Sequence, residues 1–182
     1  MSEIGEVFWF TGLSGVGKTT LGRMFFADVK KRFANVVFLD GDELRDVFGS
    51  DLGHSASDRK KSAMRNSRLC KMLSDQGIHV VIATISLFHE CQTWNRTHIP
   101  RYREIYLKAP LDVLVKRDPK GIYRKALAGE MSDVYGVDLS VEEPQHPDMI
   151  IENGSGADLD ETLAAIKTRF FPILMPPVAT GT

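Results

Sequence analysis

The stretch from Gly12 to Thr19 matches the phosphate-binding loop pattern G-x-x-x-x-G-K-[ST] at every fixed position. A short apolar run, residues 7–10, precedes it, and a helical pattern, residues 18–33, follows it. Glycines let the backbone curl so that its N–H groups face phosphate oxygens, and the start of the following helix adds partial positive charge. A chance match in a glycine-bearing turn is the alternative, but it would not explain the strand and helix on either side. The motif therefore predicts a protein that binds ATP or GTP.

Within this loop, Lys18 and Thr19 carry the groups that a nucleoside triphosphate requires. We expect Lys18 to reach the β- and γ-phosphates and the Thr19 hydroxyl to contact Mg²⁺. A GTPase-type switch would also carry an Asn-Lys-x-Asp signature for guanine, and the sequence has none. The predicted cofactors are therefore ATP and Mg²⁺. The loop residues expected to contact the nucleotide are Gly12, Ser14, Gly15, Val16, Gly17, Lys18, Thr19 and Thr20.

Length and composition favour a single domain. The chain has 182 residues, of which 43% are hydrophobic, and we expect one kinase domain over residues 1–175 and a disordered tail over residues 176–182. The balance of 23 Lys and Arg against 24 Asp and Glu predicts no nucleic-acid or membrane partner. The sequence has no signal peptide and no run long enough to span a bilayer, so a cytoplasmic location is expected. The two cysteines and five histidines lack metal-ligand spacing, which predicts no structural metal.

Strand-like and helix-like segments alternate along the chain. This pattern predicts an α/β fold: a P-loop NTPase-type doubly wound parallel sheet of about five strands with flanking helices. In such sheets, ligands bind at the carboxyl ends of the strands. The apolar runs assigned to strands are residues 7–10, 36–39, 79–85, 102–108 and 148–153.

Polar residues follow two of these strands. Asp40 and Asp42 come directly after the second strand, and Arg45 shares a helix face with Asp42. Phosphoryl transfer to a hydroxyl needs one carboxylate near that hydroxyl and another near the metal, and an arginine can fork onto a phosphate. A turn with acidic caps for the next helix is the alternative. Ser86 ends the third strand, also at the ligand edge.

Two basic features of the sequence could either bind substrate or simply lie exposed to solvent. Residues 116–125 hold five basic side chains beside a proline and a glycine, which is typical of a mobile lid closing over phosphates or of a solvated loop. Arg59 lies on a polar stripe of a predicted helix that a Ser57 or Asp58 cap begins, and it faces either substrate or water. The stripe comprises Arg59, Ser62, Arg65 and Asn66.

Several segments in order resemble signatures of the adenylylsulfate kinase family, whose members move the γ-phosphate of ATP to the ribose 3′-hydroxyl of adenylylsulfate. Residues 39–45 match "LDGD-x-x-R", and residues 117–126 match "RDPKG-x-Y-x-KA". Residues 9–15, 51–59 and 85–86 resemble the family's strand and loop, its "DLG…DR" segment and the start of its "ISP" motif. The resemblance implies an ATP-dependent phosphotransferase with a nucleotide substrate. It also allows a homodimer, because family members are often dimers.

The resemblance also implies roles for individual residues. Asp42 would orient or deprotonate the acceptor hydroxyl, and Asp40 would join Thr19 at Mg²⁺. Lys18 and Asp42 are thus the main catalytic candidates. Ser86 is a third, because a covalent phosphoserine has been proposed for this family, although a serine ending a strand is often only a hydrogen-bonding positioner. The remaining implied contacts are Arg117 with the ATP base, Lys120 with developing charge, and Arg45, Arg59, Ile85 and Ser86 with the acceptor.

The departures from the family pattern gather on the acceptor side. The family holds the acceptor adenine between two phenylalanines, and this chain has His54 and Val134 at those positions. Loss of both rings removes stacking of about 1–3 kcal/mol each. Adenylylsulfate, giving 3′-phosphoadenylylsulfate, is the family default, and sulfate assimilation is its pathway. Another nucleotide, such as cytidine diphosphoramidate in surface-polysaccharide biosynthesis, is the alternative, because a pyrimidine needs less stacking surface. A non-catalytic nucleotide-binding module is a remoter one.

Overall fold

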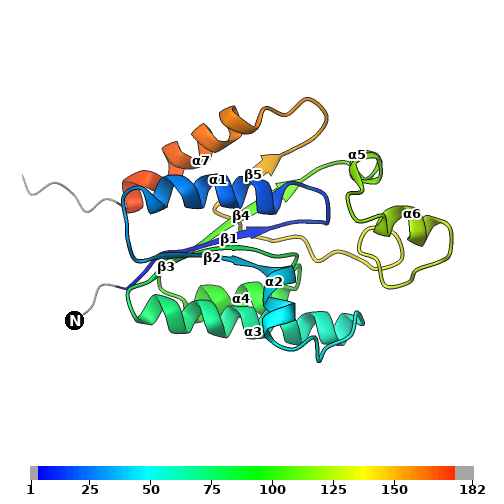
Figure 1. Cartoon of the computed structure of the whole chain (residues 1–182), viewed down its shortest axis with the longest axis horizontal. Helices are drawn as coiled ribbons and strands as arrows, with labels where there is room; N and C mark the ends of the chain where they lie inside the picture. Colours follow the sequence, from blue (N-terminus) through cyan, green and yellow to red (C-terminus); the bar gives the residue numbers. More distant parts are fainter. Residues whose placement is uncertain (1–3, 175–182) are drawn as a thin grey trace, which may run out of the picture.

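The sheet has five strands, and every strand is parallel to its neighbours (Figure 1). This computed structural model describes residues 4–174. The strand order is β2-β3-β1-β4-β5, so the strand before the phosphate-binding loop lies at the centre of the sheet. The predicted fold class is confirmed. The strands are β1 (Val7–Thr11), β2 (Val36–Asp40), β3 (His79–Ala83), β4 (Tyr102–Lys108) and β5 (Met149–Glu152).

Helices cover both faces of the sheet. Helices α1 and α7 lie on one face, and α3 and α4 lie on the other, as Figure 1 shows. Helices α5 and α6 lie beyond the carboxyl ends of the strands (Figure 1). The helices are α1 (Lys18–Lys30), α2 (Gly41–Val47), α3 (Ala56–Asp75), α4 (His89–His98), α5 (Leu111–Arg117), α6 (Ile122–Leu127) and α7 (Leu159–Leu174).

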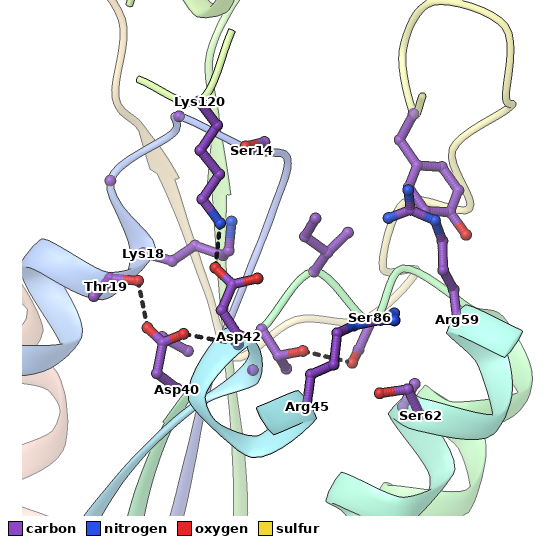
Figure 2. Close-up of a pocket in the computed structure, with 18 of the residues that line it drawn as sticks. Ser14, Lys18, Thr19, Asp40, Asp42, Arg45, Arg59, Ser62, Ser86 and Lys120 are labelled. Carbon is purple, nitrogen blue, oxygen red and sulfur yellow. Dashed lines mark hydrogen bonds and ion pairs between the residues drawn. The ribbon is translucent and has the colours of Figure 1, made fainter. Parts of the chain in front are cut away.

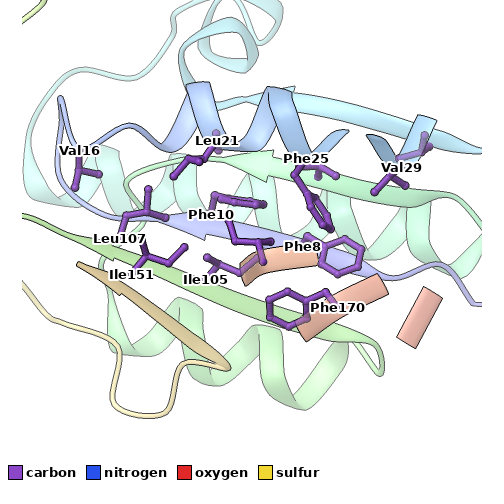
Figure 3. Packing of buried hydrophobic residues seen from close by; sticks show 14 of the residues in the cluster. Phe8, Phe10, Val16, Leu21, Phe25, Val29, Ile105, Leu107, Ile151 and Phe170 are labelled. Atoms are coloured by element: carbon purple, nitrogen blue, oxygen red, sulfur yellow. The ribbon is translucent and has the colours of Figure 1, made fainter. Parts of the chain in front are cut away.

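The two core clusters follow from the alternation of side chains along each strand. Successive side chains of β1 alternate between the faces, so Phe8 and Phe10 join one core cluster while Val7 and Trp9 join another. On the first face, the Phe8 ring meets the Phe25 ring of α1 edge-on, with centroids 4.9 Å apart (Figure 3). Burial of each such ring contributes about 1.5–3 kcal/mol. Because both faces of β1 are buried, the position of the loop that follows is well defined.

Register brings three strand ends together. Phe10 of β1 is paired with Ala83 of β3, and Asp40 of β2 is paired with the same Ala83 on its other side. The phosphate-binding loop, the Asp40–Asp42 segment and the segment after β3 therefore leave the sheet as neighbours at one edge. This edge is where the sequence predicts the nucleotide site.

Some local details differ from the sequence-based expectations. Helix α3 begins earlier than predicted, because Ser55 rather than Ser57 or Asp58 caps it and accepts a 3.2 Å hydrogen bond from the backbone of Asp58. The basic segment expected as a loop contains the start of α6, which Gly121 precedes with a left-handed φ of 68°. The single domain over residues 1–175 stays a prediction, and the disordered tail predicted for residues 176–182 lies outside the described residues.

Candidate active site

A cavity of about 320 Å³ opens at the carboxyl edge of the sheet. Figure 2 shows its two sides, with Lys18, Thr19 and Asp40 at one end and Arg45, Arg59 and Ser86 at the other. Asp42 and Lys120 meet between these ends (Figure 2). The predicted site residues that line the cavity are Ser14, Gly15, Gly17, Lys18, Thr19, Thr20, Asp40, Asp42, Arg45, His54, Arg59, Ile85, Ser86 and Lys120.

The phosphate-binding loop has a shape that only its glycines permit at two points. Gly12 has a φ of 147°, and a Cβ there would come within 2.4 Å of the Leu107 carbonyl oxygen. Gly17 precedes α1 with a left-handed φ of 97°. The side-chain amide of Asn153 donates to the Val16 carbonyl at 2.7 Å, and the Tyr123 hydroxyl donates to the Ser14 carbonyl at 3.0 Å. Side chains from two other segments thus anchor the curled loop, a form suited to a chain of phosphates.

Lys18 is nearly enclosed by this loop. Its ammonium group donates to the Leu13 carbonyl at 2.7 Å. Burial lowers the pKa of Lys18 to about 8, and the positive charge of Lys120 adds to this effect, while Asp42 and Asp40 oppose it. A buried cation without full compensation favours an anionic ligand beside it, which is what the motif predicts.

Thr19 and Asp40 bring two side-chain oxygen groups together. The Thr19 hydroxyl donates to Asp40 Oδ2 at 2.8 Å, while Asp40 Oδ1 accepts the backbone N–H of Asp42 at 2.9 Å as the cap of α2. Among residues 4–174 no group of three or more His, Cys, Asp or Glu side chains is arranged to hold a metal. Mg²⁺ often takes one or two protein oxygens and completes its shell with phosphates and water. This donor set fits that ion.

Asp42 is the carboxylate in the middle of the cavity. It lies in the first turn of α2 and pairs with the ammonium group of Lys120, which the segment between α5 and α6 supplies (Figure 2). The side chain is largely exposed to the cavity and solvent. A carboxylate here can accept a proton from a hydroxyl that lies between the two ends of the site.

Two arginines face the other end of the cavity. Arg45 Nη1 donates to the carbonyls of Leu52 at 2.6 Å and Gly53 at 3.1 Å. Arg59 Nε donates to the His54 carbonyl at 2.7 Å. Partial burial lowers the pKa of His54, and the charges of the two arginines lower it further, while the charge of Asp42 opposes them. This end of the site therefore offers fixed positive charge beside a ring whose neutral form is favoured.

Ser86 has a constrained backbone and a buried side chain. Its φ of 28° lies in the left-handed region, which is uncommon for a residue with a Cβ. Its hydroxyl lies 3.1 Å from the hydroxyl of Thr84, and the preceding carbonyl, that of Ile85, accepts a 2.5 Å hydrogen bond from Thr11. The contact from Thr11 holds the loop after β3 against the end of β1.

Four predicted site residues do not line the cavity. Gly12 and Val16 belong to the phosphate-binding loop but face the protein interior. Gly12 lies against the Leu107 carbonyl, and Val16 is part of the core. Arg117 ends α5 outside the cavity and donates to the carbonyls of Asn153 and Gly154 at 2.9 and 2.7 Å. Val134 packs into the core cluster under α6, and its neighbour Tyr135 lines the cavity. Val134 therefore does not line the cavity, and its contact with the acceptor stays a prediction that this position does not favour.

Sequence reasoning also missed lining residues. Thr84 and Phe88 flank Ser86 in the chain, so the strand end that indicated Ser86 could have indicated them. Tyr135 lies in a long loop without periodicity, and no sequence signal places its side chain. The lining residues that were not predicted are Gly41, Ser62, Ala63, Ala83, Thr84, Phe88, Pro119 and Tyr135.

The fold and the cavity define a P-loop protein built to bind nucleotides and transfer phosphoryl groups. The sequence profile of the adenylylsulphate kinase family matches residues 4–152. The chain belongs to this family and is a phosphotransferase. No helix within residues 4–174 has the length and apolar character needed to cross a membrane.

Individual relatives are similar over most of their length. A cytidine diphosphoramidate kinase from Campylobacter jejuni is 39% identical over 163 residues, covering 88% of this chain and 93% of that protein. An adenylyl-sulfate kinase from Geotalea uraniireducens is 40% identical over 162 residues, covering 88% and 77%. Among solved structures, the Mycobacterium tuberculosis APS kinase CysC in complex with AMPPNP and APS superposes with a TM-score of 0.83 at 30% identity, covering 92% of this chain and 98% of that one.

Proposed function

We propose that this protein transfers the γ-phosphate of ATP to the ribose 3′-hydroxyl of a nucleotide. The observation that carries the proposal is the arrangement within one cavity. A phosphate-binding loop and a pair of oxygen ligands lie at one end, two arginines lie at the other, and Asp42 lies between them. A donor triphosphate and an acceptor phosphate would then bind at opposite ends, with the acceptor hydroxyl between them.

At the donor end, the loop and Lys18 hold the β- and γ-phosphates. Thr19 and Asp40 hold Mg²⁺, which supplies charge neutralisation to the phosphates when it is bound. Arg117, anchored on the Asn153 and Gly154 carbonyls, packs beside the ATP base. The ammonium of Lys120 neutralises the charge that develops on the transferred group.

At the acceptor end, Arg45 and Arg59 bind the 5′-phosphate groups, and Ile85 and Ser86 line the ribose. Asp42 accepts a hydrogen bond from the 3′-hydroxyl and takes its proton as the oxygen–phosphorus bond forms. The bond between the γ-phosphorus and the bridging oxygen breaks, and ADP leaves. Transfer is direct, so Ser86 forms no phosphoserine. The homodimer that the family resemblance allows and the cytoplasmic location expected from the sequence both stay predictions.

For the acceptor, cytidine diphosphoramidate is favoured by two observations. His54 lines the cavity where the family has one of its two stacking phenylalanines, and the similarity to the Campylobacter jejuni relative named for this substrate covers 93% of that protein. Adenylylsulfate is the second candidate, because other relatives of similar identity, such as the Geotalea uraniireducens protein, are named for it. The first acceptor implies surface-polysaccharide synthesis, and the second implies sulfate assimilation.

A coupled assay of ADP release tests both the proposed reaction and the identity of the acceptor. Mg²⁺-ATP is supplied with each of the two acceptors at equal concentration, and phosphorus NMR locates the new phosphate. Turnover with a 3′-phosphate product on either acceptor supports the reaction, and the ratio of kcat/KM values assigns the acceptor. The control is the matching 3′-deoxynucleotide, which lacks the accepting hydroxyl. ADP release that is equally fast with this control, or a product phosphorylated elsewhere, contradicts the proposal.

A further inference from the structure

Two adjacent side chains of the loop between α6 and β5 point to opposite sides. The carboxylate of Asp138 accepts the backbone N–H groups of Asp133 at 2.7 Å and Val134 at 2.6 Å. Asp133 itself has a left-handed φ of 62°. This tight turn places the Val134 side chain in the core and leaves the next residue, Tyr135, at the wall of the cavity. An aromatic ring thus reaches the acceptor end from a position one residue beyond the one where the family pattern places it.

Tyr135 contacts the arginine that we assign to the acceptor. The guanidinium carbon of Arg59 lies 5.4 Å from the centroid of the Tyr135 ring, within the range of a cation–π interaction (Figure 2 shows the Arg59 side chain). The same guanidinium group donates to the His54 carbonyl at 2.7 Å and to the Asp133 carbonyl at 3.0 Å. Arg59 is therefore held by a ring and two carbonyls, which come from two segments far apart in the chain.

The Tyr135 ring is itself fixed. The Phe88 ring meets it edge-on, with centroids 6.1 Å apart and an interplanar angle of 78°. Both rings line the cavity together with Ala63 and Ile85, so this wall is largely apolar beside Arg59 and Ser62. An apolar and aromatic wall beside a phosphate-binding arginine suits a nucleoside base joined to its 5′-phosphate.

We propose that Tyr135 is a specificity-determining residue of the acceptor site, where its ring positions Arg59 and forms the wall for the acceptor base. This inference rests on the proposed function, because it assigns the acceptor to this end of the cavity. Position 135 then supplies the aromatic contact to the acceptor that the family pattern places at position 134. The ligand class is a nucleoside 5′-diphosphate or its close analogue.

Three variants test the role of the ring. Tyr135→Leu keeps an apolar side chain but removes the ring, and we expect the KM for the acceptor to rise about tenfold while the KM for ATP stays unchanged. Tyr135→Phe keeps the ring and should restore the KM for the acceptor. Val137→Ala is the matched control, because Val137 packs on the core from the same loop but does not line the cavity. An unchanged acceptor KM in Tyr135→Leu, or an equal rise in Val137→Ala, overturns the inference.

An equilibrium measurement separates this inference from the proposed reaction. Cytidine 5′-diphosphate and adenosine 5′-monophosphate are titrated by calorimetry into the wild-type and Tyr135→Leu proteins, each saturated with a non-hydrolysable ATP analogue. Weaker binding to Tyr135→Leu, without turnover in the wild-type protein, would support the acceptor wall and contradict the kinase reaction. Turnover in the wild-type protein with equal nucleotide binding to both proteins would support the reaction and overturn the role of Tyr135.

Discussion

The ammonium group of Lys120 pairs with the carboxylate of Asp42, 78 residues earlier in the chain. Lys120 lies between α5 and α6, outside the sheet, whereas Asp42 lies in the first turn of α2 at the sheet edge. The pair joins the basic segment of residues 116–125 to the residue that we propose as the proton acceptor. Both side chains are exposed, so the pair contributes about 0–1 kcal/mol to stability and can open readily for substrates.

Asp42→Asn should lower kcat more than it weakens ATP binding. An amide keeps the size of the side chain but cannot take the proton of the acceptor hydroxyl, and general-base catalysis contributes about 100- to 10,000-fold. Steady-state kinetics with varied ATP and acceptor should show this fall in kcat, with the KM for ATP within a few-fold. Asp46→Asn, the same change on α2 outside the cavity, is the control. Weaker ATP binding with kcat retained would instead place Asp42 at the metal alone.

Lys18→Ala should lower turnover by about 100-fold or more while the fold stays intact. The Leu13 carbonyl holds the ammonium within the loop where we propose that the phosphates bind, and its loss removes a preorganised charge at the transferred group. Thermal melting should show no loss of stability, because a buried lysine with a lowered pKa costs folding free energy when charged. Lys30→Ala, at the exposed end of α1, is the matched control. Turnover equal to wild type would refute the kinase assignment.

ATP binding should weaken as the pH rises above about 8, the pKa of Lys18 in the nucleotide-free protein. Above that pH the ammonium loses its proton before ATP binds, so the dissociation constant should rise by up to about tenfold per pH unit. The folded protein then binds fewer protons than the unfolded chain between about 8 and the ordinary value of 10.5. In this window the contribution of Lys18 to the free energy of unfolding rises with pH, so unfolding does not cause the weaker binding.

Titration of a non-hydrolysable ATP analogue from pH 7 to 10, with thermal melts at each pH, checks this behaviour. Lys18→Arg is the informative control, because a guanidinium does not titrate in this range and should give a flat profile. A flat profile in the wild-type protein would show that the Lys18 pKa is not lowered.

Ser86→Ala should keep turnover within about tenfold of the wild type, because direct transfer needs no covalent intermediate. The hydroxyl contacts Thr84 at 3.1 Å and lies at the cavity wall, so its loss should disturb positioning only modestly. Alanine keeps the Cβ and therefore leaves the unusual φ of 28° equally strained. A fall to the level of Lys18→Ala, together with phosphoserine detected by mass spectrometry in the wild-type protein, would support a covalent step instead.

The donor end of the site was predictable because its chemistry is local. Gly12 to Thr19 is one continuous segment, and its glycines, lysine and threonine have the same neighbours in every chain that forms this loop. Asp40 and Asp42 were predictable for the same reason, because they lie at the end of a strand that the apolar pattern identifies and just after it. Arg117 was also placed by a motif, but its position outside the cavity depends on how α5 packs.

The acceptor end was less predictable because its walls come from separate segments. Phe88, Tyr135 and Ala63 meet through the packing of α3, α4 and the loop before β5, and no spacing in the chain encodes that meeting. The identity of residue 134 suggested a lost ring. The turn held by Asp138 decides instead that residue 135 faces the cavity, because its hydrogen bonds set the direction of each side chain.

By itself the sequence determined the fold class, the phosphate-binding loop and the family, since alternation of apolar runs and short motifs depend only on neighbours in the chain. The tertiary structure alone decided which side chains share the acceptor wall and that Lys120 meets Asp42. Such contacts depend on strand register and loop conformation, which arise from the packing of the whole core rather than from any single segment.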